Sequence, residues 1–292
     1  MLLLLVLHTK KPYLPNTLSI RLLLPKTTIL IRTVAGREHL LRQAIDSVVA
    51  QTVDAWEIVV VEDGPSDAAT IIKGFPDTVH TRVRLYRNPG KGRCNAGNFA
   101  LQQAIGDYCC FLDDDDKLYP NHLQALVFLI EKNPQAVAAV ARADIEYVQG
   151  DKVLCRRAAP PLPASSHPLR QRNQMPIQAV VFRRLTGLAV GGLDVGLNHF
   201  EDWDFWLRLL TKGGFIWHGV ITSCYSLPAN TKAAHRRALA AAQYFPILAE
   251  KAKSYIFHDG SMGLLPISKR RALYERLMRC YPLLALRMRL LY

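Results

Sequence analysis

The chain has 292 residues, half of them apolar, and Lys plus Arg outnumber Asp plus Glu by 37 to 24. This length and apolar content are enough to bury a large core, and they favour one large α/β domain with an appendage. The net charge of +13 predicts attraction to anions, a class that includes nucleic acid, anionic lipid and phosphorylated substrates. The six cysteines form no CxxC pair, so neither a zinc site nor a disulfide framework is indicated. A reducing cytosol is the simplest setting.

The first 26 residues are rich in leucine, but their opening apolar run ends at His8. That run is too short to span a bilayer, and the segment lacks the flanking features of a secretory signal. We therefore expect residues 1–26 to be an N-terminal extension and the residues before Lys26 to be dispensable for folding.

Two β-branched apolar runs separated by a helical pattern open the folded region. Residues 28–31 and 57–61 are predicted strands, and apolar residues recur at helical spacing over residues 40–49. This βαβ order predicts parallel strands with right-handed crossovers. Ligands of such sheets bind at the carboxyl ends of the strands, where Thr33 and Asp63 fall.

A segment rich in glycine and basic residues, 88–98, follows the predicted strand at 83–86 and opens a helix. A loop of this kind at a helix N-terminus can hold a phosphate, and it contains Lys91 and Arg93. It is neither a P-loop nor a dinucleotide fingerprint, so a solvated surface turn is the alternative.

The apolar run at residues 108–112 predicts a buried strand, and four consecutive carboxylates, Asp113 to Asp116, follow it directly. Because side chains alternate along a strand, Asp113 and Asp115 are expected to share a side. Adjacent like charges repel, so the cluster is best tolerated when a cation neutralises it, and carboxylates suit Mg²⁺ or Mn²⁺. A solvated acidic turn is the alternative.

The pattern changes in the second half of the chain. Predicted elements there are a helix at 123–130, strands at 136–148, 152–156, 177–182 and 215–225, a polar loop at 160–174, and an Ala-rich helix at 231–248. A helix at 199–210 has an aromatic stripe and carries Glu201 and Asp202 in its first turn. Acids in that turn also complement the helix dipole, and the stripe can be ordinary core.

Four segments resemble, in order, glycosyltransferase family 2, whose members are nucleotide-sugar transferases of the GT-A type: residues 29–52, 57–67, 88–120 and 177–210. Two strings carry the resemblance in combination, Phe-Leu-Asp-x-Asp-Asp-x-x-x-Pro from Phe111 and Glu-Asp-Trp-Asp-x-Trp-x-Arg from Glu201. The resemblance implies an α/β GT-A fold with a mostly parallel central sheet flanked by helices.

The resemblance also implies roles for single residues on the nucleotide and acceptor sides. Thr33 and Asp63 would hold the nucleotide base, and Arg93 would meet the base or the diphosphate. Asp202 matches the catalytic base. It would take the proton from an acceptor hydroxyl as that hydroxyl attacks the anomeric carbon with inversion.

The metal site implied by the resemblance is the Asp-x-Asp formed by Asp113 and Asp115, with Mn²⁺ or Mg²⁺ as the cofactor. Asp114 could instead reach the ribose, because four carboxylates leave the register ambiguous by one residue. A divalent ion would relieve charge on the departing diphosphate. The chain departs from the family at Arg32, where a small or apolar residue is common, and at Gly36-Arg37, near its usual Tyr-Asn.

The implied partners are a nucleotide-diphospho-sugar donor, with a UDP-sugar favoured, and a glycan or lipid-linked acceptor in cell-surface glycan assembly. No nucleic-acid partner is expected, because the basic residues are not interleaved with aromatics into an RNA-binding motif. Residues 27–230 are the expected transferase domain, and residues 231–292 a helical, basic C-terminal tail. Residues 268–292 hold seven Lys or Arg against one Glu, which suits peripheral contact with the cytoplasmic membrane face or a charged helix pair.

Two other functions stay open at the level of sequence. A metal-dependent nucleotidyl or phosphoryl transferase could use the same acidic strand end, but it would want a glycine-rich loop after the first strand. Residues 33–37 contain a single glycine there. A non-catalytic nucleotide- or nucleic-acid-binding module would fit the positive charge, although the acidic cluster would repel a phosphate backbone unless metal were bound.

Overall fold

The computed structural model describes residues 26–160, 167–261 and 264, so the basic stretch at residues 268–292 and nearly all of the N-terminal extension lie outside the described residues. The strands are β1 Thr27–Thr33, β2 Trp56–Glu62, β3 Val83–Arg87, β4 Tyr108–Asp113, β5 Lys117–Leu118, β6 Ala136–Gln149, β7 Lys152–Ala158, β8 Val180–Arg183 and β9 Gly214–Pro228. The helices are α2 Glu38–Val49, α3 Ala68–Lys73, α4 Asp77–His80, α5 Arg93–Gln103, α6 His122–Glu131, α7 Arg184–Ala189, α8 Glu201–Leu210 and α9 Thr231–Ala252. Two 3₁₀ turns, η1 His167–Arg170 and η2 Ile177–Ala179, complete the set.

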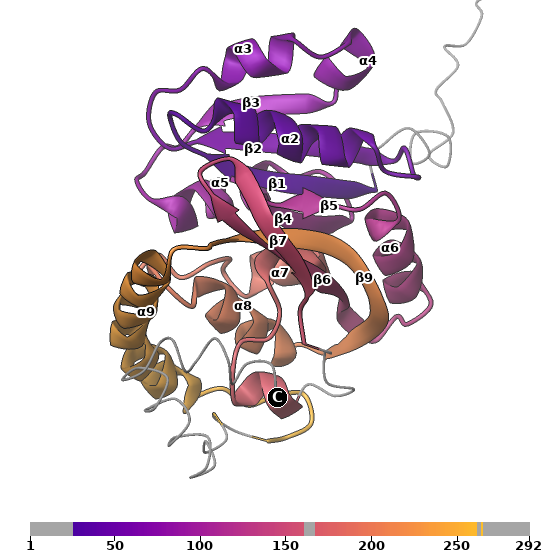
Figure 1. The fold of residues 1–292 in the computed structure, drawn as a ribbon. Coiled ribbons are helices and arrows are strands. Elements are labelled where there is room, and N and C mark those ends of the chain that lie inside the picture. The colour runs from indigo at the N-terminus through magenta and orange to yellow at the C-terminus, as the bar shows by residue number, and fades with distance from the viewer. Residues whose placement is uncertain (1–25, 161–166, 262–263, 265–292) are drawn as a thin grey trace, which may run out of the picture.

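One curled sheet organises the molecule, with helices on both of its faces (Figure 1). Its strand order is β3-β2-β1-β4-β8-β6-β9-β5, and β7 pairs with β6. The strands from β3 to β4 are all parallel, as the βαβ pattern predicted. Strand β8 then joins β4 and β6 antiparallel, while β6 and β9 run parallel to each other. The predicted α/β class with flanking helices is therefore confirmed.

The first strands are apolar throughout because both of their faces are covered. All seven residues of β1 and of β2 are buried. Successive side chains point to opposite faces, so Ile29 and Ile31 join the core cluster that contains the buried side of α2. Leu30, between them, joins the other cluster, together with residues of α5 and α8. Burial on two faces explains a continuous apolar run where a one-sided strand would alternate.

The strand predicted at residues 177–182 begins three residues late. Residues Ile177–Ala179 form the 3₁₀ turn η2, closed by the Ala179 amide donating to the Pro176 carbonyl at 3.0 Å. Pairing starts at Val180, opposite Val140 of β6, and continues at Val181. Pro176 fixes its own backbone near the turn's start, which bends the chain before the sheet receives it.

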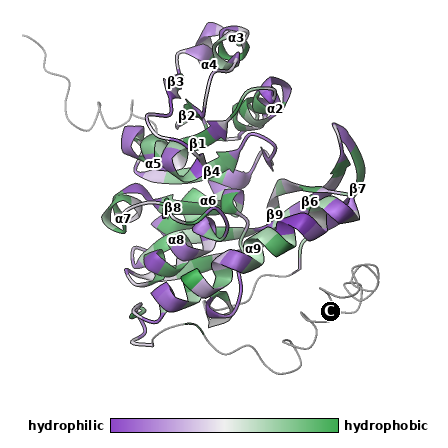
Figure 2. Ribbon diagram, turned by 90° about the vertical axis from the view of Figure 1, so that its left-hand side faces the viewer, coloured by the Kyte–Doolittle hydropathy of each residue, from purple (hydrophilic) through white to green (hydrophobic). Residues whose placement is uncertain are grey.

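The Ala-rich helix predicted at 231–248 is α9, which reaches Ala252 and packs beside α8 (Figures 1 and 2). Leu248, Ala252 and Phe257 are buried in the same core cluster as the aromatic residues of α8. The predicted domain boundary between residues 230 and 231 stays a prediction, with α9 packed against the sheet domain. Among the residues that the structure describes, none of the helices combines the length and apolarity needed to cross a membrane.

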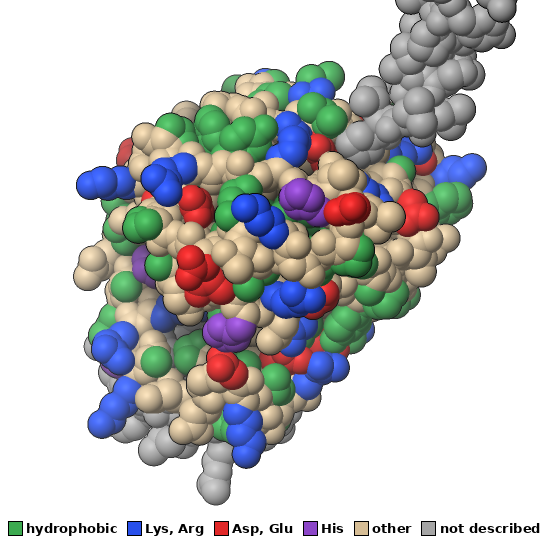
Figure 3. Space-filling view, turned by 90° about the horizontal axis from the view of Figure 1, so that it is seen from above, with side chains coloured by type: hydrophobic (Ala, Val, Ile, Leu, Met, Phe, Trp, Pro, Cys, Tyr) green, Lys and Arg blue, Asp and Glu red, His purple; other side chains and the backbone are tan. Residues whose placement is uncertain are grey.

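Two surface features can be followed in the figures. The β6–β7 hairpin extends away from the body (Figure 2), and every residue of β7 is exposed. Seen from the α3–α4 end (Figure 3), Lys and Arg side chains are interspersed with Asp and Glu. This face is therefore a mixed, solvated surface and differs from the continuous basic stripe typical of a nucleic-acid interface.

Candidate active site

The carboxyl ends of β1, β2 and β4 meet at one edge of the sheet. Thr33 of β1 lies opposite Glu62 of β2, and Arg32 of β1 lies opposite Asp113 of β4. The Asp63 amide then donates to the Thr33 carbonyl at 2.8 Å. The parallel register thus gathers the predicted nucleotide-side and metal-side residues, which are far apart in sequence, at one place.

Asp114 points into the protein, where it is 2% exposed. The Thr33 hydroxyl donates to its Oδ2 at 2.8 Å, and Nη2 of Arg37 lies 3.0 Å from its Oδ1. Burial raises the pKa of Asp114 to about 7, an effect that Arg37 and the Thr33 hydroxyl only partly offset. Thr33 and Asp114, two of the residues predicted to contact the nucleotide, are therefore hydrogen-bonded to each other.

Asp113 is paired with the buried guanidinium of Arg32, which is 6% exposed. Nε of Arg32 donates to Oδ1 of Asp113 at 2.8 Å, and Nη2 reaches the same oxygen. Burial alone would raise the pKa of Asp113, but the Arg32 charge and hydrogen bonds outweigh it, so the pKa lies below its ordinary value. Asp113 is thus held ionised by a residue that departs from the family pattern.

Asp115 and Asp116 complete the acidic turn and differ in exposure. Asp115 is 38% exposed, and its Oδ2 lies 2.6 Å from Nη2 of Arg37. Asp116 is buried and accepts the Ser226 amide of β9 at 3.1 Å. Burial, followed by repulsion from Asp115 and Asp113, raises the pKa of Asp116 well above its ordinary value. The turn therefore packs four carboxyl groups closely together, and Arg32 and Arg37 pair with three of them.

This cluster of carboxyl groups fits a bound divalent cation. Carboxylate oxygens are the ligands that Mg²⁺ and Mn²⁺ prefer, and the positive charge of such an ion would offset the repulsion that adds to burial in raising the pKa of Asp116. Within the described ranges no three His, Cys, Asp or Glu side chains are already gathered into a metal cage. Mg²⁺ is commonly held by one or two carboxylates plus substrate phosphates, so an incomplete set of protein ligands is suited to an ion that binds with a nucleotide.

Asp63 organises the glycine-rich loop. Its Oδ1 accepts from Nδ2 of Asn88 at 2.9 Å, and its Oδ2 accepts the Gly92 amide at 2.8 Å. Gly92 has a φ of +83°, a conformation that favours glycine, and it directly precedes α5. Asp63 therefore fixes the start of α5, where Arg93 is the first helical residue.

Glu201 joins the two halves of the site, and sequence reasoning did not identify this role. It is buried, forms an ion pair with Nη2 of Arg93, and lies 4.0 Å from Nη1 of Arg32. The preceding residue, Phe200, has a φ of +64°, which is uncommon for an aromatic residue and sets the direction of α8. The sequence contains no local signal for this role, because Glu201 and its two arginine neighbours lie in distant segments of the chain.

Asp202 faces a different partner from its neighbour Glu201. Nδ2 of Asn173 donates to its Oδ2 at 2.8 Å, and the Trp203 amide donates to its Oδ1 at 2.7 Å. Burial, and then repulsion from Glu201, raise the pKa of Asp202 to about 6. Asn173 lies in the loop that the sequence marked only as polar, so its contact with Asp202 could not be anticipated.

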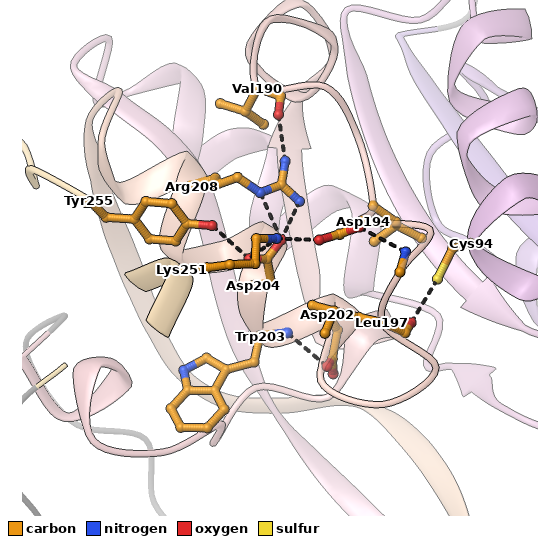
Figure 4. A network of polar contacts seen from close by, with 12 residues as sticks. Cys94, Val190, Asp194, Leu197, Asp202, Trp203, Asp204, Arg208, Lys251 and Tyr255 are labelled. Carbon is orange, nitrogen blue, oxygen red and sulfur yellow. Dashed lines mark hydrogen bonds and ion pairs between the residues drawn. The ribbon is translucent and has the colours of Figure 1, made fainter. Parts of the chain in front are cut away.

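The third acid of α8, Asp204, lies at the centre of a network of polar contacts that joins α8 to α9 (Figure 4). Asp204 is fully buried and accepts from Nε of Arg208 at 2.8 Å, from Nζ of Lys251 at 3.0 Å and from the Tyr255 hydroxyl at 2.7 Å. Lys251 also pairs with Asp194. This network ties α8 to the end of α9, and so fixes the helix that presents Glu201 and Asp202.

The chain matches the family model described as "Glycosyl transferase family 2" over residues 29–190, more than half of its length. It belongs to glycosyl transferase family 2. The matched region runs from within β1 to the end of α7 and contains all four carboxylates of the acidic turn, whereas α8 with Asp202 lies beyond it.

Individual known proteins agree with the family. An uncharacterized glycosyltransferase of Haemophilus influenzae is 27% identical over 176 residues, which are 59% of this chain and 58% of that protein. The Escherichia coli UDP-Glc:alpha-D-GlcNAc-diphosphoundecaprenol beta-1,3-glucosyltransferase WfgD is 27% identical over 198 residues, 66% of this chain and 74% of that protein. The crystal structure of S. aureus TarS 1–349 with UDP-GlcNAc superposes with a TM-score of 0.57 at 16% identity, covering 78% of this chain and 72% of that one. The predicted GT-A fold is confirmed.

The Asp204 network generates a prediction about stability. Asp204→Asn is expected to lower the free energy of unfolding by about 2 kcal/mol or more, because it leaves the partly buried cationic groups of Arg208 and Lys251 facing a neutral, fully buried side chain. Lys251 keeps Asp194, which places the loss at the lower end for a broken buried pair. Urea unfolding followed by fluorescence measures it. Asp46→Asn, at an exposed pair with Arg42, is the control and should change the value by about 0.5 kcal/mol or less. Equal effects of the two substitutions would contradict the role given to Asp204.

Proposed function

We propose that this protein is an inverting glycosyltransferase that moves a sugar from a nucleotide-diphospho-sugar to a hydroxyl acceptor in the assembly of a cell-surface polysaccharide or glycolipid. The observation that carries the proposal is that the acidic turn at the sheet edge and the acids in the first turn of α8 lie on either side of Arg32. The carboxylates of Asp113 and Asp115 lie at the sheet edge, and Asp202 lies on α8 next to Glu201, which pairs with Arg93 and approaches Arg32. The relative WfgD, by its name a UDP-Glc-dependent enzyme with a diphosphoundecaprenol-linked acceptor, supports a UDP-sugar donor and a lipid-linked acceptor.

Asp202 is suited to accept a proton from the acceptor hydroxyl. Its pKa of about 6 leaves it mostly ionised at neutral pH, yet makes it a stronger base than a solvated aspartate. Asn173 and the Trp203 amide hold the two carboxylate oxygens in fixed directions. A single base is sufficient for inversion, because the acceptor hydroxyl displaces the nucleoside diphosphate in one step.

The departing diphosphate would be met by positive charge from two sources. Held by Asp113 and Asp115, a divalent cation would supply Lewis-acid neutralisation of the diphosphate oxygens. Arg93, which is 42% exposed at the start of α5, supplies a guanidinium that can exchange its contact with Glu201 for one with phosphate. Asp63 would contribute indirectly, because it fixes the loop from which α5 begins.

The direct test is product analysis with a panel of nucleotide-sugars and Mn²⁺, with and without lipid-linked acceptors. Release of nucleoside diphosphate is expected, whereas release of pyrophosphate would instead identify a nucleotidyl transferase. Asp202→Asn should lower transfer by about 10²-fold or more, since it removes general base catalysis. Donor affinity should be unchanged in Asp202→Asn. The control is Asp46→Asn, near the C-terminal end of α2, which should leave both the transfer rate and the donor affinity at the wild-type level. A fully active Asp202→Asn enzyme would disprove the assignment of the base.

The raised pKa of Asp202 predicts a pH dependence. Protonation removes the base as the pH falls through about 6, so kcat/KM should decline about tenfold per pH unit below that value. The hydrogen bond from Asn173 favours the ionised carboxylate, so Asn173→Ala should move the midpoint to higher pH. Rates measured between about pH 5 and pH 8 for both proteins provide the check. If the midpoint of the pH profile is the same in Asn173→Ala as in wild type, the profile does not report the titration of Asp202.

The acidic turn predicts metal-dependent nucleotide binding. UDP should bind in the presence of Mg²⁺ or Mn²⁺ and lose most of its affinity in EDTA, as measured by calorimetry. Asp115→Asn should remove most of the metal-linked part of the affinity, because Asp115 is the most exposed of the three acidic-turn carboxylates that pair with arginine. Equal affinity for UDP with and without metal would rule out this role.

A further inference from the structure

Two arginines neutralise the acidic turn, and they differ in how firmly they are held. Arg32 is 6% exposed and donates twice to one oxygen of Asp113 from inside the sheet. Arg37 is 35% exposed and lies outside the sheet, immediately before α2. The Asp113 contact is therefore part of the buried fold, whereas the contact between Arg37 and Asp115, which is 38% exposed, lies where solvent ions can reach it.

The backbone beneath Arg37 is fixed even though its side chain is accessible. Gly36, with a φ of +80°, makes the turn, and its amide donates to Oε1 of Glu38 at 3.1 Å. From this anchored position the guanidinium reaches two consecutive carboxylates. Its Nη2 lies 3.0 Å from Oδ1 of Asp114 and 2.6 Å from Oδ2 of Asp115. The guanidinium therefore bridges the buried Asp114 and the more exposed Asp115 from a fixed backbone.

A divalent cation bound to Asp115 would lie close to the Arg37 guanidinium, which contacts Oδ2 of the same carboxylate at 2.6 Å. Mg²⁺ binds carboxylate oxygens at about 2.1 Å, and two cations so near each other would repel and compete for the same negative charge. A cation that arrives alone must displace Arg37 and gains few protein ligands in return, since the described carboxylates form no preassembled cage. A cation that arrives with a nucleoside diphosphate brings its own phosphate ligands. The phosphates also offer the displaced guanidinium a new anion to contact.

The geometry points to Arg37 as an internal counter-ion of Asp114 and Asp115, which a divalent cation displaces and which makes cation and nucleotide bind together. The nucleotide part of this inference rests on the proposed function. The competition between Arg37 and the metal does not depend on it. In the empty enzyme Arg37 lowers the affinity for the free cation. In the loaded enzyme its guanidinium faces the donor, so each ligand strengthens the binding of the other.

The test measures Mn²⁺ binding to the full chain, from the electron paramagnetic resonance signal of free Mn²⁺, with and without UDP. Arg37→Gln should bind Mn²⁺ alone at least about fivefold more tightly than wild type and should show a smaller gain on adding UDP. Arg37→Lys keeps a cation at this position and should bind Mn²⁺ within about twofold of wild type. Arg42→Gln is the matched control, because it removes an equal charge from an exposed pair with Asp46 and should change neither quantity.

The outcomes separate this inference from the proposed function. Unchanged or weaker Mn²⁺ binding by Arg37→Gln, in a protein with a wild-type circular dichroism spectrum, overturns the counter-ion role even if UDP binds with metal. Tighter Mn²⁺ binding by Arg37→Gln supports it even if UDP does not bind, a result that would count against the proposed donor. Equal tightening by Arg42→Gln would show an effect of net charge and would also overturn the specific role of Arg37.

Discussion

The buried guanidinium of Arg32 is the interaction on which the site depends. It lies in a strand covered on both faces, where an unpaired charge would be strongly destabilising. Asp113 of the neighbouring strand neutralises it, and Glu201 of α8 approaches it at 4.0 Å from the other side. One cation thus holds the acidic sheet edge and the first turn of α8 at a set separation.

Other properties of the site follow from this arrangement. Glu201 is drawn toward Arg32 and Arg93, so the next residue, Asp202, turns toward Asn173. The nearby Glu201 charge then adds to burial in raising the pKa of Asp202 to about 6, a value suited to a base at neutral pH. The carboxylate that organises the site and the carboxylate proposed to react are therefore adjacent residues with different environments.

Two further networks keep these side chains in place. Asp204 connects α8 to Lys251 and Tyr255 at the end of α9 (Figure 4), which explains why α9 belongs to the same core cluster as the sheet. Asp63 secures the loop before α5 through Asn88 and Gly92. Arg93, which we propose exchanges Glu201 for phosphate during the reaction, thus begins a helix whose preceding loop is held in place.

The sequence by itself determined the elements and the acidic residues of the site. Continuous apolar runs gave β1, β2 and β4, because strands buried on two faces need no polar positions. The βαβ order placed the strand ends at one edge, so the sequence alone assigns Thr33, Asp63 and the acidic turn to one site. Local periodicity and chain order are sufficient for such conclusions.

Only the tertiary structure decided which charges pair. Arg32 and Asp113 are 81 residues apart, and Asn173 and Asp202 are 29 apart, in segments whose local patterns contain no information about each other. The antiparallel insertion of β8 and the 3₁₀ turn before it likewise depend on where neighbouring strands leave room. The partner of a buried charge is fixed by the packing of distant elements, and so the roles of Glu201, Asn173 and Arg37 appear only in three dimensions.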